Sequence, residues 1–92
     1  MTKTNLKLKT IIDKIQNGAI TNITLEVYEA NKLLEAKFAI DLRTAVLLSF
    51  NILCDNSGEC FELIKSELKN KGILFIRHNN IDFDLERFDI NL

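Results

Sequence analysis

Two stretches of the chain, residues 23–40 and 73–85, alternate apolar and polar residues and contain a turn near their centre. A period of two is typical of a β-strand that buries one face, so each stretch predicts a β-hairpin. In each hairpin a single turn position satisfies two independent requirements, an apolar face and a cross-strand ion pair. This agreement sets the register of both hairpins and constrains the fold more than any other feature.

The first hairpin is predicted to turn at Asn31-Lys32, between strands of about ten residues. This turn places Glu26 opposite Lys37, which puts a carboxylate beside an ammonium group on one face. On the other face it predicts three apolar pairs, which are Val27 with Ala36, Leu25 with Phe38, and Ile23 with Ile40.

The second hairpin is predicted to turn at Asn79-Asn80, because asparagine tolerates the positive φ that a tight hairpin turn demands. With this turn Arg77 faces Asp82, and Phe75 is directed to the charged face opposite Asp84. The apolar face is predicted to pair Ile76 with Phe83 and Leu74 with Leu85.

Helices are predicted before each hairpin. Apolar residues from Leu8 to Ile15 fall at positions i, i+3, i+4 and i+7, which predicts a helix over residues 5–17 that Gly18 ends. A turn cluster precedes a further helix, predicted from Ser57 to about residue 71. Its buried stripe is predicted to contain Cys60, Phe61, Ile64 and Leu68, with Gly72 as its stop.

Residues 42–54 fit either a helix or a strand. As a helix the segment is apolar nearly all round, whereas as a strand it alternates Val46, Leu48, Phe50 and Ile52 with the residues between them. The alanine and leucine content favours the helix. Either structure must be buried on most sides, within the domain or in a homodimer interface.

Residues 1–92 are therefore predicted to form a single α+β domain of order α-β-β-α-α-β-β, with antiparallel hairpins covered by helices. The alternative makes residues 44–53 a third meander strand, which gives α-β-β-β-α-β-β. An apolar fraction of 47%, three glycines and no proline indicate a compact core and not a disordered chain. A domain this small has a thin stability margin, so a homodimer is expected through residues 42–54 or through exposed strand edges.

The N-terminus lacks the apolar stretch of a secretory signal, and no apolar run approaches the roughly 20 residues of a membrane span. These features predict a cytoplasmic protein that does not enter the membrane. Two cysteines are too few for a disulfide framework and suit a reducing compartment. The abundance of asparagine, isoleucine and lysine suggests a bacterial or phage source.

Cysteine and histidine are the most reactive side chains available for catalysis. Cys60, near a helix N-terminus, with His78 would be a weak nucleophile and base pair, because no third group orients the base. Five residues separate Cys54 from Cys60, which is not a standard zinc spacing. We therefore predict no metal, no cofactor and no enzymatic activity, and keep a small cysteine-dependent enzyme as a remote alternative.

A candidate partner-binding surface lies on the second hairpin. Carboxylates recur there every second residue, a spacing that either mimics nucleic-acid phosphates or forms the solvated face of an edge strand. The aromatic ring on that charged face is expected to be covered by a neighbouring element, or else to anchor a partner together with the tyrosine of the first hairpin. The candidate residues are Asp82, Asp84, Glu86, Asp89, Phe75 and Tyr28.

A nucleic-acid-binding surface is the second class to weigh. Lysines on the two predicted helix faces would form it, namely Lys7, Lys14, Lys65 and Lys69. A net charge of −1 and the absence of an RNP-like, helix-turn-helix or zinc-finger pattern count against this class.

With no catalytic constellation, the leading hypothesis is a non-enzymatic protein-binding module that regulates or inhibits a larger partner protein. Small bacterial adaptors, immunity proteins and phage-encoded inhibitors supply the analogy, and candidate targets include host defence and nucleic-acid machinery. Nucleic acid would then be reached directly or through the partner.

Overall fold

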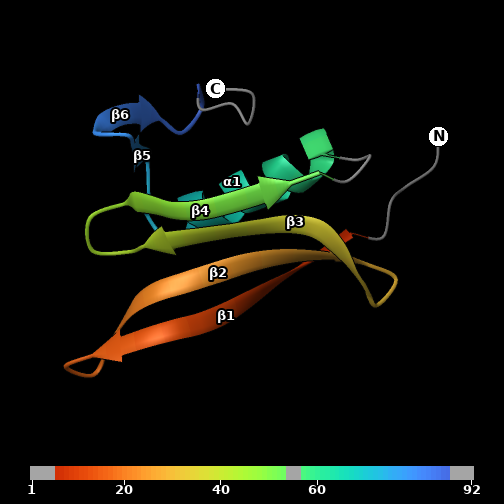
Figure 1. Ribbon diagram of the computed structural model, residues 1–92, viewed down its shortest axis with the longest axis horizontal. Helices are drawn as coiled ribbons and strands as arrows, with labels where there is room; N and C mark the ends of the chain where they lie inside the picture. The colour runs from red at the N-terminus through yellow and green to blue at the C-terminus, as the bar shows by residue number, and fades with distance from the viewer. Residues whose placement is uncertain (1–5, 54–56, 88–92) are drawn as a thin grey trace.

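The computed structural model describes residues 6–53 and 57–87, and these residues form one six-stranded sheet and one helix (Figure 1). In chain order the elements are β1 (Leu6–Gln16), β2 (Ala19–Glu29), β3 (Lys32–Asp41), β4 (Val46–Ile52), α1 (Ser57–Asn70), β5 (Phe75–His78) and β6 (Ile81–Asp84). The strands keep this order across the sheet. β1 to β4 form an antiparallel meander, α1 connects β4 to a parallel β5, and β6 returns antiparallel to β5.

The predicted order α-β-β-α-α-β-β is wrong, because the described residues contain a single helix and a sheet that begins with four meander strands. The alternative, α-β-β-β-α-β-β, is also wrong, at its first element. Residues 5–17, predicted as a helix, contain β1, and the ambiguous residues 42–54 contain β4.

β1 is a strand because it is joined to β2 by a tight turn that the helical interpretation overlooked. Asn17 and Gly18 both have positive φ, at 55° and 80°, and Gln16 pairs with Ala19 on either side of them. Two consecutive positive φ values define a turn whose twist matches that of a hairpin, and Asn-Gly is its preferred sequence. Gly18 therefore reverses the chain and does not cap a helix.

β4 is a strand because it completes the sheet between β3 and β5, where a helix would leave both neighbours unpaired. Its register shifts between Ala39 and Ile40 of β3, so Leu47 and Ile52 are buried while Leu48 is half exposed. β4 pairs along its length with β3 and at Val46 with β5, so this segment is a strand of the sheet and not the apolar helix considered for a dimer interface. At the two ends of the strand order, β1 and β6 each have one edge open for pairing.

The predicted register of the first hairpin is confirmed for Glu26 and the residues of β2 that precede it, and it is wrong at the turn. Glu26 pairs with Lys37, and the apolar pairs Leu25 with Phe38 and Ile23 with Ile40 form as expected. The turn is nevertheless at residues 30–31, where both φ values are positive, and an irregularity between Glu26 and Tyr28 absorbs the offset. This bulge keeps the buried face in register although the turn is displaced.

The second hairpin and α1 agree with prediction. Asn79 and Asn80 form the turn with φ values of 54° and 64°, and Ile76 pairs with Phe83. α1 ends at Asn70, and Gly72, two residues later, has a φ of 81°. The amides of Gly72 and Ile73 donate to the carbonyls of residues 69 and 68 at 2.9 Å each, which is a Schellman motif.

The core lies between α1 and one face of the sheet, and Figure 1 shows α1 behind β3 and β4. The predicted helix stripe of Cys60, Phe61, Ile64 and Leu68 is buried there. These side chains pack against sheet residues that include Ile23, Leu25, Val27, Phe38 and Ile40. No described helix or strand covers the opposite face of the sheet, which we call the open face.

Candidate binding surfaces

The β5–β6 hairpin exposes an aromatic ring. Phe75 pairs with Asp84 as predicted, but the expectation that a neighbouring element covers Phe75 is wrong, because 56% of its surface is exposed. Leu74 and Ile81 of the same hairpin region are also exposed, at 60% and 55%. The Phe75 ring is therefore accessible to a partner, as the alternative prediction requires.

The carboxylate of Asp82 is held by Arg77 across the hairpin. Arg77 Nε donates to Asp82 Oδ1 at 2.8 Å, and Arg77 Nη2 donates to Oδ2 at 3.3 Å. This two-point hydrogen bond lowers the pKa of Asp82 and raises the pKa of Arg77. Asp82 is therefore neutralised within the hairpin and is a poor anion for a partner.

The predicted row of carboxylates is shorter than expected. β6 ends at Asp84, whose Oδ1 accepts a hydrogen bond from the Glu86 amide at 2.9 Å, and this local bond stabilises a turn that takes Glu86 out of the strand. Glu86 forms an ion pair with Lys69 of α1, and Asp89 lies outside the described residues. Of the predicted acidic residues that the structure describes, Asp84 alone forms no ion pair.

Tyr28 is not near Phe75. β3 and β4 lie between β2 and β5, which separates the two rings by about 14 Å or more at the usual strand spacing. Tyr28 also pairs with Leu33 near the turn that joins β2 to β3, whereas Phe75 lies toward the other end of the sheet, beside the turn between β3 and β4. The two aromatic residues therefore belong to separate surfaces.

Tyr28 is part of a polar row across the open face. Its hydroxyl donates to Glu26 Oε1 at 3.1 Å, and Lys37 Nζ lies 3.5 Å from Glu26 Oε2. Glu26 is only 6% exposed, so its charge is satisfied from within the sheet. The hydrogen bond to Glu26, followed by burial and the negative charge of Glu26, raises the pKa of Tyr28.

A hollow of about 580 Å³ lies beside Tyr28. Lys9 Nζ is 6.0 Å from the centre of the Tyr28 ring, and Lys7 pairs with Tyr28 in the β1–β2 register. The turn between β2 and β3 closes one end of the hollow, whose lining residues are Lys7, Lys9, Tyr28, Ala30 and Asn31. Sequence analysis missed Lys9, because the helical interpretation of β1 put Lys7 and Lys9 on different faces.

The four lysines predicted to bind nucleic acid are divided between the two layers. Lys7 and Lys14 lie on β1, whereas Lys65 and Lys69 lie on α1, behind the sheet. Lys65 Nζ lies 4.7 Å from the Phe61 ring centre and 3.6 Å from Glu62. Because Lys69 also forms an ion pair, the helix lysines and strand lysines do not form one basic surface.

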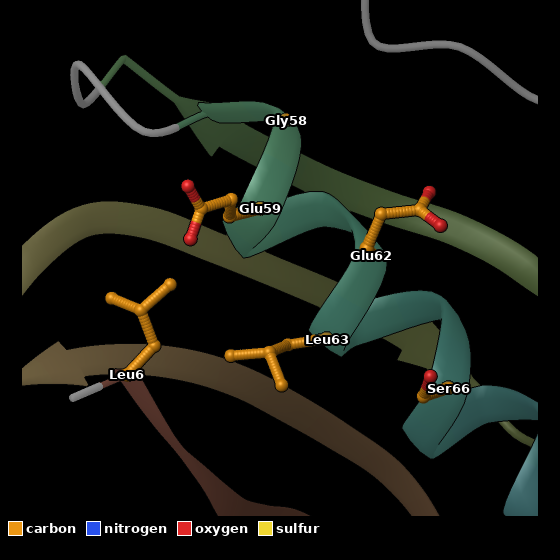
Figure 2. Close-up of a pocket in the computed structure, with 6 residues that line it drawn as sticks. All are labelled: Leu6, Gly58, Glu59, Glu62, Leu63 and Ser66. Carbon is orange, nitrogen blue, oxygen red and sulfur yellow. The ribbon is translucent and has the colours of Figure 1, made fainter. Parts of the chain in front are cut away.

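A larger groove of about 720 Å³ lies between α1 and the start of β1 (Figure 2). Leu6 and Leu63 point toward one another across it, and Glu59 and Glu62 flank its helical side. Ser66 lies at its far end. No sequence pattern predicted this groove, because it depends on the packing of α1 against a segment that was predicted to be helical.

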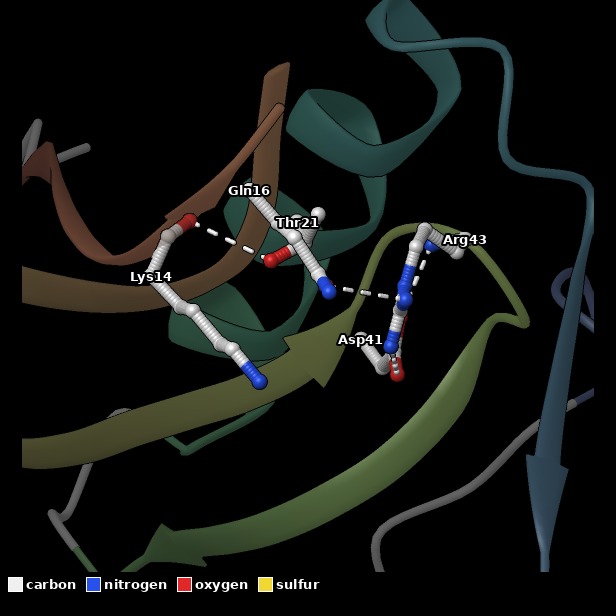
Figure 3. A network of polar contacts seen from close by, with 5 residues as sticks. All are labelled: Lys14, Gln16, Thr21, Asp41 and Arg43. Carbon is white, nitrogen blue, oxygen red and sulfur yellow. Dashed lines mark hydrogen bonds and ion pairs between the residues drawn. The ribbon is translucent and has the colours of Figure 1, made fainter. Parts of the chain in front are cut away.

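A polar network links the β1–β2 turn to the β3–β4 turn, at the end of the sheet opposite Tyr28 (Figure 3). Arg43 donates from its backbone to Asp41 Oδ1 at 2.9 Å and from Nη1 to Gln16 Oε1 at 3.1 Å. Burial acts to raise the pKa of Asp41, but the hydrogen bonds from Arg43 and its positive charge outweigh burial and lower it. This network holds the tip of the β1–β2 hairpin to the β3–β4 turn.

The structure places the cysteine and histidine that were considered as a nucleophile and base pair in packed positions. Cys60 is fully buried, so its thiol does not reach solvent, and Cys54 lies outside the described residues. The His78 ring packs against Phe50, with ring centres 6.2 Å apart. Residues 6–53 and 57–87 hold no group of three or more histidine, cysteine or acidic side chains able to bind a metal ion.

None of the helical structure in residues 6–53 and 57–87 has the length and apolar character that crossing a membrane requires. Comparison with protein-family models, curated proteins and solved structures gives no match to this chain.

Proposed function

We propose that this protein is a non-enzymatic binding module that regulates or inhibits a larger partner protein through its β5–β6 hairpin. The observation that carries the proposal is the exposure of the Phe75 ring beside Asp84 on a hairpin that also exposes Leu74 and Ile81. Leu74 and Ile81 lie on the opposite face of the hairpin from Phe75, so the proposed surface is centred on Phe75 itself. An exposed aromatic ring on a small hairpin is typical of a protein-interaction surface, because aromatic residues dominate the binding energy of such surfaces.

The charges around Phe75 indicate the chemistry of the partner. Arg77 and Asp82 neutralise each other, and the two hydrogen bonds that Arg77 donates to Asp82 fix both side chains on the face of the hairpin that carries Phe75. Asp84, directly opposite Phe75, is the carboxylate left to meet a partner. The complementary surface is therefore an apolar pocket for the ring with a lysine or arginine at its rim.

The experiment is an affinity capture from a lysate of the source cells, treated with nuclease and run at moderate salt. The wild-type protein is expected to retain one stoichiometric protein, and Phe75→Ala and Asp84→Lys are each expected to reduce its retention at least tenfold. The matched control is Leu48→Ala, since Leu48 is 50% exposed on a different strand and should leave retention unchanged.

Loss of the Phe75 ring should cost about 1 kcal/mol of stability, because the residue is 56% exposed and loses less than half of the burial of a core phenylalanine. Thermal unfolding of each variant therefore separates a lost contact from a lost fold. Equal retention of the partner by wild type and by folded Phe75→Ala would exclude this surface.

A further inference from the structure

The open face near the β2–β3 turn combines an aromatic ring with uncommitted positive charge. Among the side chains that the structure describes, no carboxylate forms an ion pair with Lys7 or Lys9, while Glu26, which lies opposite Lys9 in the β1–β2 register, is engaged by Lys37 and the Tyr28 hydroxyl. The hollow lined by Lys7, Lys9 and Tyr28 is thus locally cationic although the whole chain carries a net charge of −1.

Lys7 and Lys9 project from the same face of β1, because residues two apart on a strand share a face. Their separation along the strand is about 6.6 Å, so the two ammonium groups form a short row beside the ring and not a single clamp. A row of cations suits an extended polyanion better than an isolated phosphate.

We propose that this hollow binds single-stranded nucleic acid, with one base stacked on the Tyr28 ring and adjacent phosphates bound by Lys7 and Lys9. Stacking on an aromatic ring accepts any base, and lysines follow the backbone without reading sequence. A single strand is favoured over an acidic peptide because the site offers an aromatic plane beside its charges, and a peptide carboxylate has no use for that plane.

The hydrogen bond from Tyr28 to Glu26 has a positioning role in this site. It ties the hydroxyl to a carboxylate that is itself held by Lys37, so the orientation of the ring is set before a ligand arrives. Lys9, whose ammonium lies 6.0 Å from the ring centre, must move aside for a base and is then close to the phosphate of that nucleotide.

Tyrosine fluorescence tests the proposal directly, because Tyr28 is the single tyrosine and the chain has no tryptophan. We expect a twelve-nucleotide oligothymidylate, and the matching oligouridylate, to quench this emission in a saturable manner at low salt. Fluorescence anisotropy of labelled oligonucleotide should show that affinity falls as salt rises, with a log–log slope that becomes shallower by about 0.7 for each lysine contact removed.

Variants separate stacking from simple charge attraction. Tyr28→Phe keeps the ring but removes its hydrogen bond to Glu26, so it should weaken binding only slightly, whereas Tyr28→Leu, which keeps the bulk but not the ring, should lose roughly tenfold. Lys7→Gln and Lys9→Gln should each weaken binding and reduce the salt slope. Lys71→Gln, on the helical side, is the matched control and should change neither quantity.

Three results would overturn the proposal. The first is no quenching by either oligonucleotide at low salt, and the second is equal binding by Tyr28→Leu and Tyr28→Phe. The third is equally tight binding of polyglutamate, which would indicate an acidic peptide as the ligand. Phe75→Ala should leave oligonucleotide binding unchanged, so this site and the proposed protein-binding hairpin can fail independently.

Discussion

The Tyr28 hydroxyl makes a bond whose effect can be measured without a ligand. Its hydrogen bond to Glu26 favours the protonated phenol, so the pKa of Tyr28 lies above its ordinary value of 10.0. We predict that tyrosinate absorbance will appear at higher pH in the native protein than in denaturant. Glu26→Gln should move the Tyr28 pKa back toward 10.0, whereas Glu29→Gln, which removes a nearby carboxylate that does not bond to Tyr28, should not.

The raised pKa of Tyr28 also makes the stability of the protein depend on pH. Because the phenol deprotonates first in the unfolded chain, the contribution of Tyr28 to stability is complete below pH 10 and is lost as pH rises through the native pKa. Asp82 has the opposite sign, since its lowered pKa makes its contribution disappear as pH falls through the native value. An unchanged Tyr28 pKa in Glu26→Gln would contradict the role given to Glu26.

Single residues also show where the sequence was informative. Asn79-Asn80 predicted its turn correctly because asparagine accepts positive φ at low cost. The turn between β2 and β3 uses Ala30 at φ 49°. This conformation costs an alanine about 1–2 kcal/mol, and composition does not predict it. The phenyl ring of Phe75 was expected to be covered by a neighbouring element. This expectation failed because hydrophobic patterning predicts which face a residue lies on and not which element covers that face.

Among the elements, the two ends of α1 offer a test in which the same glycine-to-alanine substitution is expected to have opposite effects on stability. Gly72 has φ +81° in the Schellman motif, whereas Gly58, in the first turn of α1, has no positive φ, and a Cβ would meet no atom within 4 Å at either position. We predict that Gly72→Ala destabilises the protein by about 1 kcal/mol, through strain in the left-handed region. Gly58→Ala should stabilise it by up to about 1 kcal/mol, through helix propensity.

Urea unfolding of both variants, with wild type as reference, measures the difference. Because neither substitution creates a steric clash, the two changes isolate backbone conformation from packing. Stabilisation by Gly72→Ala would mean that α1 continues past Asn70 and that the Schellman motif does not end it.

The elements differ in how far their sequences determined them. α1 and the second hairpin were predicted because caps, turn residues and apolar periodicity all agreed. β1 was not, because its isoleucines fit a helical stripe as well as a strand, and only Asn17-Gly18 distinguishes the two. β4 was ambiguous because its apolar residues occupy both faces of the strand, and a bulge interrupts its alternation further.

At the scale of the whole molecule, the sheet has one weak connection. β5 pairs with β4 through one residue pair in register, Val46 with Arg77, and the Arg77 amide donates to the Ala45 carbonyl at 2.9 Å. The β1–β4 meander is paired along nearly its whole length by comparison. The hairpin proposed to bind a partner is therefore the part of the sheet best able to open by itself.

The candidate sites also depend on whole-molecule arrangement, which explains why residue patterns did not predict them. Tyr28 and Phe75 were expected to act together because each lies on the polar face of its hairpin. Which strands lie between two hairpins depends on the complete strand order, and the misassigned β1 and β4 left that order unknown. The misassignment of β1 also hid the association of Lys9 with Tyr28.

Native-state hydrogen exchange can test whether the β5–β6 hairpin opens separately. We predict that amides of β5 and β6 exchange through a partial opening that leaves β2 and β3 folded. Ile76 and Ile23 make a matched pair, since both are almost completely buried and lie on opposite sides of the weak connection. Each isoleucine-to-valine change should cost about 0.5–1.5 kcal/mol of global stability.

Ile76→Val should accelerate exchange in β5–β6 and also in β2–β3. The contacts of Ile76 are lost both in the partial opening and in global unfolding, so the substitution lowers the free energy that each process requires. Ile23→Val should accelerate exchange in β2 and β3 but leave β5 and β6 unchanged, since its contacts persist while the hairpin is open. If Ile23→Val accelerates both regions equally, the sheet opens only as one unit. In that case a partner that docks on Phe75 must bind the hairpin in its closed form.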